Sequence, residues 1–231
     1  MTDRTNPPLT DSKHAAWRTG MEENRLPASY RSVHAKAAAE IIEKKSRFIG
    51  EIFPAATEEE ALSHIAAVKK QYYDARHHCS AFICGTRGEL LRSSDDGEPQ
   101  GTAGKPILAV LTGAGLTNTL IVVTRYFGGT LLGTGGLTRA YTQAAQAALS
   151  AAQIDTHTFG QDITATVSYS LSGAVERALR KTGFAMETPV YENDVRFTVF
   201  VPVAHADALI NDLTNICSGN IDISLSDPRY N

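Results

Sequence analysis

The sequence predicts an α+β protein made of two α/β-sandwich domains. Strand-like and helix-like patterns alternate over residues 31–158, and after residue 158 the pattern starts again in the order β-α-β-β-α-β. That second order, completed within about 70 residues, is typical of a ferredoxin-like unit. The chain has 231 residues, of which 42% are apolar and 20% charged, as in an ordinary globular protein with a hydrophobic core.

The chain divides into an extension and two domains. Residues 1–30 contain Pro7-Pro8 and Pro27, scattered charges and little periodicity, which predicts a flexible extension. The first domain is expected at 31–158 and the ferredoxin-like domain at 159–231.

The elements of the first domain follow from caps, turns and periodicity. Thr57 followed by Glu60 forms a capping box, and apolar residues at helical spacing then predict a helix over 58–72. Pro106 suits the first turn of a short buried helix over 107–113. The remaining elements are an extended segment over 33–53 interrupted at 44–46, a hairpin of 79–85 with 89–93, a strand over 119–124 and a helix from 137 to about 153.

The second domain repeats the same kinds of signal. Ser172 is expected to cap a helix that runs through Lys181 and is closed by Gly183. Strands are expected at 163–169, 187–191, 195–201 and 221–225, and a second helix at 204–216.

Charge limits the classes of ligand. The 22 basic and 25 acidic residues give a net charge of −3. The chain as a whole is therefore not expected to bind nucleic acid by nonspecific electrostatic attraction. Residues 31–158 hold 13 basic and 12 acidic residues, a net +1, whereas 159–231 hold 5 and 9, a net −4. A polyanion site is therefore expected in the first domain.

The apolar runs, the N-terminus and the cysteines of the sequence predict the cellular compartment. The longest apolar run, residues 107–111, is far shorter than a membrane span, and no apolar segment of a secretion signal follows Met1. Three cysteines fit a reducing compartment better than a disulfide framework. We expect a cytoplasmic protein that does not enter a membrane.

Glycine-rich loops beside charged residues fill the interval 93–139. Gly133-Thr134-Gly135-Gly136 opens a helix whose free N–H groups could receive a phosphate or carboxylate, with Arg139 in the first turn; the alternative is a tight strand-to-helix turn. Neither this segment nor Gly104-Lys105 fits a Walker A or dinucleotide motif.

Arg125-Tyr126-Phe127 directly follows a buried strand. An Arg beside two aromatic residues can stack on a base and contact phosphate. The alternative is that the two rings belong to the core and that Arg125 neutralises Asp95 or Asp96. The predicted ligand- or nucleic-acid-binding residues are Lys105, Arg125, Tyr126, Gly128, Gly129, Gly135, Gly136 and Arg139.

Two further groups have chemical alternatives. Asp95, Asp96 and Glu98 could bind Mg²⁺ or act in acid–base chemistry, but such clusters more often make turn hydrogen bonds and ion pairs, for which Lys105 is the natural partner. The adjacent residues His77, His78 and Cys79, with Cys84, have poor spacing for one metal ion or for a nucleophile and its base. No catalytic residue, metal or cofactor is predicted.

Five motifs together resemble the YigZ/IMPACT family. They are Lys44-Lys45-Ser46-Arg47-Phe48-Ile49, residues 74–79, 94–99 and 101–106, and the segment 124–139 with Arg-Tyr-Phe-Gly-Gly and Gly-Thr-Gly-Gly-Leu. The resemblance covers about residues 30–155, and the second domain is similar to that of the bacterial YigZ branch.

The resemblance implies both fold and role. It implies a first domain like the second domain of a ribosomal small-subunit protein, and a ferredoxin-like domain like the last domain of elongation factor G. Eukaryotic IMPACT proteins regulate translation, an activity associated with a further N-terminal domain for which this sequence has no counterpart. The family offers no catalytic residues to transfer.

Three hypotheses remain at this stage. The first is a non-catalytic, translation-linked regulator that binds the ribosome, RNA or a translation factor through the glycine-rich loops. The second is an enzyme acting on a phosphorylated or nucleotide substrate with the acidic cluster as metal ligand or base. The third makes the loops an interface of a homo-oligomer or partner protein.

Overall fold

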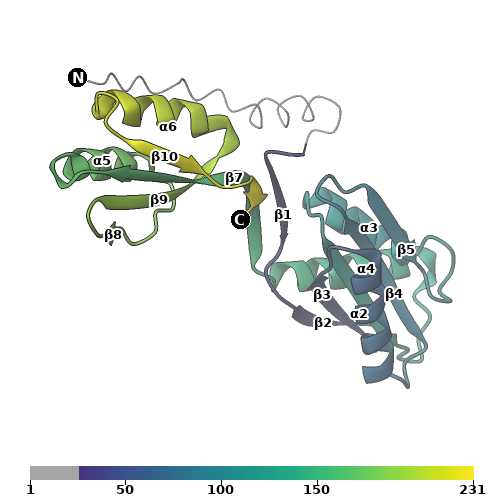
Figure 1. The fold of residues 1–231 in the computed structure, drawn as a ribbon. Helices are drawn as coiled ribbons and strands as arrows, with labels where there is room; N and C mark the ends of the chain where they lie inside the picture. The colour runs from purple at the N-terminus through teal and green to yellow at the C-terminus, as the bar shows by residue number, and fades with distance from the viewer. Residues whose placement is uncertain (1–25) are drawn as a thin grey trace, which may run out of the picture.

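The computed structural model describes residues 26–231 and shows two α+β domains (Figure 1). The mixed α+β fold in two domains is thus confirmed. Residues 1–25, which include most of the predicted extension, lie outside the described residues. The last two residues of that predicted extension, Ser29 and Tyr30, begin a strand, β1 (Ser29–Val33), which pairs with β7 (Ile154–Val167).

The N-terminal domain is built on a five-stranded antiparallel sheet in the order β2-β3-β6-β4-β5. The central strand β6 is apolar on both faces, as expected for a strand buried between two layers. Its strands are β2 (Ala37–Glu43), β3 (Ser46–Pro54), β4 (His77–Cys84), β5 (Leu90–Ser94) and β6 (Thr119–Tyr126).

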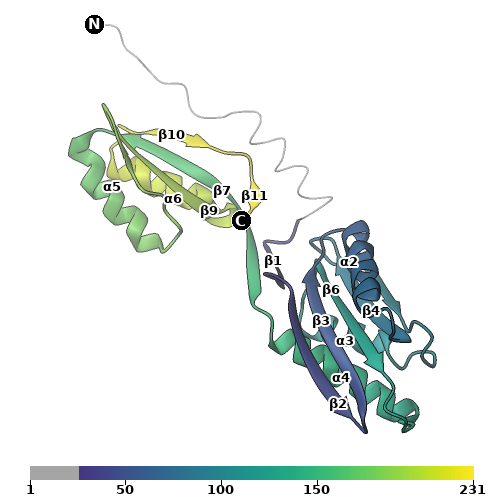
Figure 2. The ribbon, with the colours of Figure 1, turned by 90° about the horizontal axis from the view of Figure 1, so that it is seen from below.

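Helices cover both faces of this sheet (Figure 2). Helix α2 (Glu58–Gln71) packs on one face, where Phe53, Phe82 and Val122 point. Helices α3 (Gly104–Gly113) and α4 (Gly133–Ser150) pack on the opposite face and enclose the larger core. The sheet therefore holds the connections at its ends in a rigid frame.

Local sequence patterns predicted most of these elements correctly. The hydroxyl of Thr57 accepts a hydrogen bond from the N–H of Glu60, which confirms the predicted helix start. Lys44 and Lys45 form a two-residue β2–β3 turn with φ of 46° and 67°, the positive values that a type I′ hairpin turn requires.

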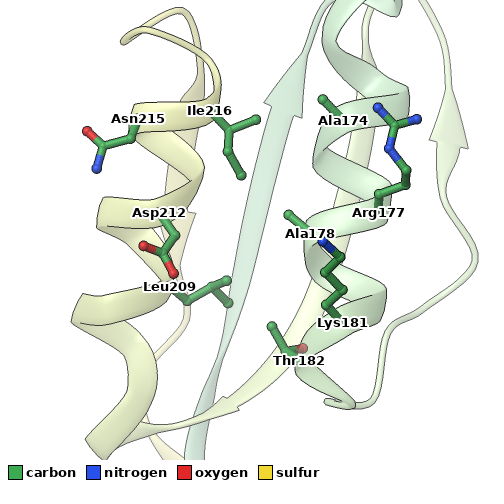
Figure 3. Close-up of a pocket in the computed structure, with 9 residues that line it drawn as sticks. All are labelled: Ala174, Arg177, Ala178, Lys181, Thr182, Leu209, Asp212, Asn215 and Ile216. Atoms are coloured by element: carbon green, nitrogen blue, oxygen red, sulfur yellow. The ribbon is translucent and has the colours of Figure 1, made fainter.

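The C-terminal domain has the strand order β10-β7-β9-β8, all antiparallel, with helices α5 and α6 packed on the sheet. This is the order of a ferredoxin-like unit. The two helices lie side by side (Figure 3). The elements are α5 (Tyr169–Thr182), β8 (Val190–Tyr191), β9 (Val195–Pro202), α6 (Val203–Ile216) and β10 (Asp222–Leu225).

The predicted start of α5 was wrong. Ser168 is the residue before the helix, and Ser172 lies in its first turn, where its hydroxyl donates to the carbonyl of Tyr169. The helix starts earlier because Leu171 already packs against the core. Gly183 closes the helix with a φ of 71°, as expected.

Strand β7 belongs to both halves of the molecule. Its residues 154–158 pair with β1, and residues 160–167 pair with β9. A short strand, β11 (Arg229–Tyr230), joins it at Phe159 and Gly160. Residue 158, proposed from the sequence as the domain boundary, therefore lies within a continuous strand. In residues 26–231, no helix is long and apolar enough to cross a membrane.

Candidate functional site

Four connections meet at one end of the N-terminal sheet. Arg47 pairs with Tyr126 and His77 with Arg125, so β3 and β4 begin beside the end of β6. Strand β5 ends nearby, and Asp95 immediately hydrogen-bonds to the start of α3. The loops lie together in Figure 2. We call residues 44–46, 72–77, 95–105 and 126–139 the loop end.

Gly128 joins two of these connections through close backbone contact. A Cβ atom at this position would lie 2.0 Å from the carbonyl carbon of Lys45. The N–H of Gly128 donates to the hydroxyl of Ser46 at 3.1 Å. The β6–α4 loop is thereby fixed against the β2–β3 turn.

The other glycines of the predicted site have more open surroundings. Gly129 has a φ of 86°, and a Cβ atom added there would meet no atom of residues 26–231 within 4 Å. Gly135 is exposed at the start of α4. Gly136 is half-buried against Leu132. Among residues 26–231, no side chain caps this end of α4, and the exposed Arg139 lies in the same helix. The N-terminal N–H groups of α4 therefore remain accessible to an acceptor.

Arg125, predicted from the sequence to bind a ligand or nucleic acid, is a buried residue. It is only 7% exposed and lies between the rings of Phe48 and Phe127, with the guanidinium carbon 5.5 Å from each centroid. Its Nη1 is 2.6 Å from Oε1 of Glu98. The alternative expectation, that Arg125 pairs with Asp95 or Asp96, was wrong, because these two carboxylates bind other groups.

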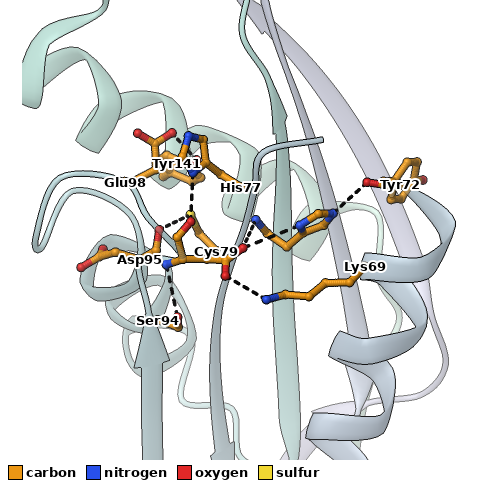
Figure 4. A network of polar contacts seen from close by, with 10 residues as sticks. Lys69, Tyr72, His77, Cys79, Ser94, Asp95, Glu98 and Tyr141 are labelled. Carbon is orange, nitrogen blue, oxygen red and sulfur yellow. Dashed lines mark hydrogen bonds and ion pairs between the residues drawn. The ribbon is translucent and has the colours of Figure 1, made fainter. Parts of the chain in front are cut away.

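Glu98 accepts a second buried hydrogen bond. The hydroxyl of Tyr141, on α4, donates to the same Oε1 at 2.8 Å (Figure 4). Burial raises the pKa of Tyr141 far above its ordinary value, which keeps the hydroxyl a donor. Glu98 thus links β6, α4 and the β5–α3 connection.

Asp95 caps helix α3. Its carboxylate accepts hydrogen bonds from the N–H groups of Gly101, Ala103 and Gly104 at 2.7, 3.0 and 2.8 Å. Burial alone would raise the pKa of Asp95, but these three bonds and the charge of Lys105 lower it below its ordinary value. Lys105 itself is exposed and makes no ion pair in the described part of the chain.

Replacing Asp95 with alanine should lower the free energy of unfolding by about 1–3 kcal/mol at pH 7, because three backbone donors lose their acceptor. Since the folded-state pKa of Asp95 is depressed, its contribution is present above the unfolded carboxyl pKa and is lost as the pH falls through the folded value. The difference from wild type should therefore be constant above about pH 5 and shrink toward about pH 2.

Urea unfolding across this pH range measures the difference. The matched control is Asp222→Ala, which removes an exposed carboxylate from β10. A difference for Asp95→Ala that does not change with pH would contradict the capping role.

Asp96 holds α2 and β4 together. Its carboxylate binds Nζ of Lys69 at 2.8 Å and the N–H of His78 at 2.7 Å. Burial opposes ionisation, but these two contacts keep the pKa of Asp96 below its ordinary value. The carbonyl of Asp96 accepts a hydrogen bond from Nδ1 of His77 at 2.9 Å. Each acidic side chain of the predicted cluster is thus engaged in the framework of the domain.

The cysteines of β4 are buried. The Cys79 thiol donates to the carbonyl of Asp95 at 3.0 Å, and burial raises its pKa to about 12 (Figure 4). Cys84 points to the opposite face of the sheet, as strand alternation predicts. Within residues 26–231, no three His, Cys, Asp or Glu side chains are grouped so as to hold a metal ion.

Tyr126 is half-buried at the end of the central strand β6. Its hydroxyl donates to Asp74 at 2.6 Å, and this hydrogen bond raises its pKa to about 12. The guanidinium of Arg47 lies over its ring, 5.7 Å from the centroid. Tyr126 therefore connects β6 to the α2–β4 segment, and one edge of the ring remains at the surface.

The surface of the loop end carries cations that were not among the binding residues predicted from the sequence. Lys44, Lys45 and Arg76 are exposed and, like Lys105 and Arg139, form no ion pair in the described part of the chain. The Lys-Lys pair could have been found from its position in a hairpin turn. The loop end also carries exposed apolar side chains: Phe127 is 53%, Leu131 84% and Tyr73 85% exposed.

Two family models match this chain. The Impact N-terminal domain matches residues 44–149, which contain the loop end, and a domain of unknown function, DUF1949, matches residues 165–220. Strand β7 connects the two matched regions.

Known proteins match over most of the chain. The IMPACT family member YvyE of Bacillus subtilis is 36% identical over 202 residues, covering 87% of this chain and 93% of YvyE. The IMPACT family member YigZ of Escherichia coli is 35% identical over 182 residues, covering 78% of this chain and 89% of YigZ. A crystal structure of a hypothetical protein, 34% identical, aligns with 86% of this chain and 97% of its own at a TM-score of 0.57. The chain therefore belongs to the IMPACT family.

Proposed function

We propose that this chain is a non-catalytic, translation-linked protein that binds RNA of the translation machinery through the loop end. The observation that carries the proposal is a set of exposed side chains on the loop end: five cations that form no ion pair within residues 26–231, and one aromatic ring. They are Lys44, Lys45, Arg76, Lys105 and Arg139, with Phe127. Eukaryotic IMPACT proteins regulate translation, and the resemblance of this chain to that family favours a role linked to translation.

The chemistry of this surface suits nucleic acid. Lysine and arginine side chains contact phosphates, and an exposed ring can stack on an unpaired base. The uncapped N-terminus of α4 adds N–H donors for a further phosphate. Because the net charge of residues 31–158 is only +1, from 13 basic and 12 acidic residues, binding should depend on these local cations rather than on a broad basic face.

The acidic residues favour binding over catalysis. Asp95 accepts three backbone hydrogen bonds, Asp96 binds Lys69 and the backbone of β4, and Glu98 binds Arg125 and Tyr141. A metal ion or substrate would have to displace these partners. We therefore place the enzyme hypothesis second and propose a cytoplasmic binding protein.

A salt series tests this role. Purified protein is co-sedimented with ribosomes, and its affinity for total cellular RNA is measured at increasing salt. In the variant Lys44→Asn/Lys45→Gly the turn keeps residues suited to positive φ while two cations are lost. We expect weaker binding and a salt dependence reduced by about two charges.

The control removes a cation from the opposite end of the sheet. Arg92 lies on β5 and is 3.6 Å from Glu58 at the start of α2, so Arg92→Gln should bind like wild type. Binding that is insensitive to salt, or equally weakened by Arg92→Gln, would contradict RNA contact at the loop end.

A further inference from the structure

The C-terminal domain has a groove between its two helices. The groove lies between α5 and α6 and has a volume of about 570 Å³ (Figure 3). Ala174, Ala178 and Thr182 lie on the side of α5 that faces α6, and Leu209 and Ile216 extend from α6 into the gap. Ile216 is 41% exposed. The floor is thus apolar and, on the α5 side, made of small side chains.

The small side chains on α5 allow a partner helix to approach the groove closely. Alanines at positions i and i+4 form one continuous row along a helix, and such a row allows another backbone to come close. A partner helix laid between α5 and α6 could bury large apolar side chains against Leu209 and Ile216. This is the geometry of helix-in-groove recognition.

The basic side chains of the C-terminal domain that form no ion pair among the described residues lie at this groove. Residues 159–231 contain five basic side chains, and three of them are paired: Arg180 with Glu176, Arg196 with Glu192 and Arg229 with Asp162, at 2.7, 3.2 and 2.7 Å. The other two, Arg177 and Lys181, form no ion pair in the described part of the chain, and both line the groove. The unpaired positive charge of an acidic domain is therefore concentrated at one wall.

We propose that this groove binds an amphipathic α-helix of a partner protein, with acidic side chains on the flank that meets α5. Arg177 and Lys181 are four residues apart, so carboxylates four residues apart on the partner could meet both. Asp212 on the opposite wall favours a basic side chain on the other flank, which fixes the orientation of the helix.

The same charges argue against a nucleic-acid strand in the groove. A polyanion would meet only two cations, with Asp212 across from them and a domain whose 5 basic and 9 acidic residues give a net charge of −4. A short acidic stripe on a helix avoids this repulsion, because it places negative charge only where Arg177 and Lys181 lie. This inference is independent of RNA binding at the loop end.

A charge exchange between protein and peptide tests the proposal. The probe is a fluorescent stapled helical peptide with one leucine face and two glutamates beside it, and its counterpart carries lysines in place of the glutamates. Binding to the full chain is followed by anisotropy. Wild type should prefer the acidic peptide, and Arg177→Glu/Lys181→Glu should weaken that binding by about tenfold or more and prefer the basic peptide.

Two further variants separate the groove from general charge. Arg180→Glu also reverses a positive charge on α5, but Arg180 is paired with Glu176. This variant should therefore weaken peptide binding less than about twofold. Ala174→Phe fills the groove and should weaken binding of both peptides, with folding checked by circular dichroism. Equal affinity of wild type for the two peptides, absence of saturable binding, or an equal loss with Arg180→Glu would overturn the proposal.

Discussion

Replacing Arg125 with methionine is expected to lower the free energy of unfolding by about 3–5 kcal/mol. The substitution leaves the Glu98 carboxylate, whose side chain is 3% exposed, without its buried cation. Tyr141 alone would then donate to Oε1 of Glu98. The flat guanidinium contacts with Phe48 and Phe127 would also be lost.

A double substitution shows whether the loss comes from the unpaired charge. Glu98→Gln in the Arg125→Met background removes the buried carboxylate charge, and the amide oxygen can still accept the Tyr141 hydrogen bond. We expect the double variant to recover a large part of the lost stability in urea unfolding followed by circular dichroism. A double variant no more stable than Arg125→Met would contradict this account of the pair.

Gly128→Ala should be the most damaging single methyl addition at the loop end, with a loss of about 3 kcal/mol or more. The new Cβ would lie 2.0 Å from the Lys45 carbonyl carbon and 2.3 Å from the Ser46 nitrogen. Both are backbone atoms of the β2–β3 turn, so the turn or the β6–α4 loop has to move. Thermal and urea unfolding measure the loss.

The neighbouring glycine is the matched control. Gly129 has a φ of 86°, but a Cβ there would meet no atom within 4 Å in the part of the chain that the structure describes. Gly129→Ala should therefore cost only about 1–2 kcal/mol for the left-handed backbone. Similar losses at the two positions would show that backbone conformation, and not contact with the turn, explains the role of Gly128. RNA affinity should also fall more for Gly128→Ala, because Lys44 and Lys45 would be displaced.

Elements with local signals could be predicted from the sequence. The capping pair Thr57 and Glu60, the apolar spacing of α2 and α4, and Gly183 after α5 each act within a few residues. Pairing of β1 with β7 could not be predicted, because it joins Ser29–Val33 to residues more than 120 positions away and no local pattern records such a contact.

The candidate site was only partly predictable for a similar reason. Strand β6 is apolar on both faces, so alternation did not show that Arg125 follows Ile121 and Val123 toward the α3–α4 core. The carboxylate that pairs with it lies in a loop 27 positions away. The side chains of Lys44 and Lys45 were missed because hairpin turns are usually interpreted for backbone conformation and not for the charge they present.

The shared strand β7 limits how the length of this chain can change during evolution. Segments between domains usually tolerate insertions and deletions. In β7, residues 154–158 pair with β1 and residues 160–167 pair with β9, and side chains alternate between the two faces throughout. Adding or removing one residue near Phe159 would turn one half of the strand over and move Ile163, Ala165 and Val167 out of the core. Only insertions or deletions of an even number of residues preserve the alternation, so this connection is constrained in evolution like a part of the core.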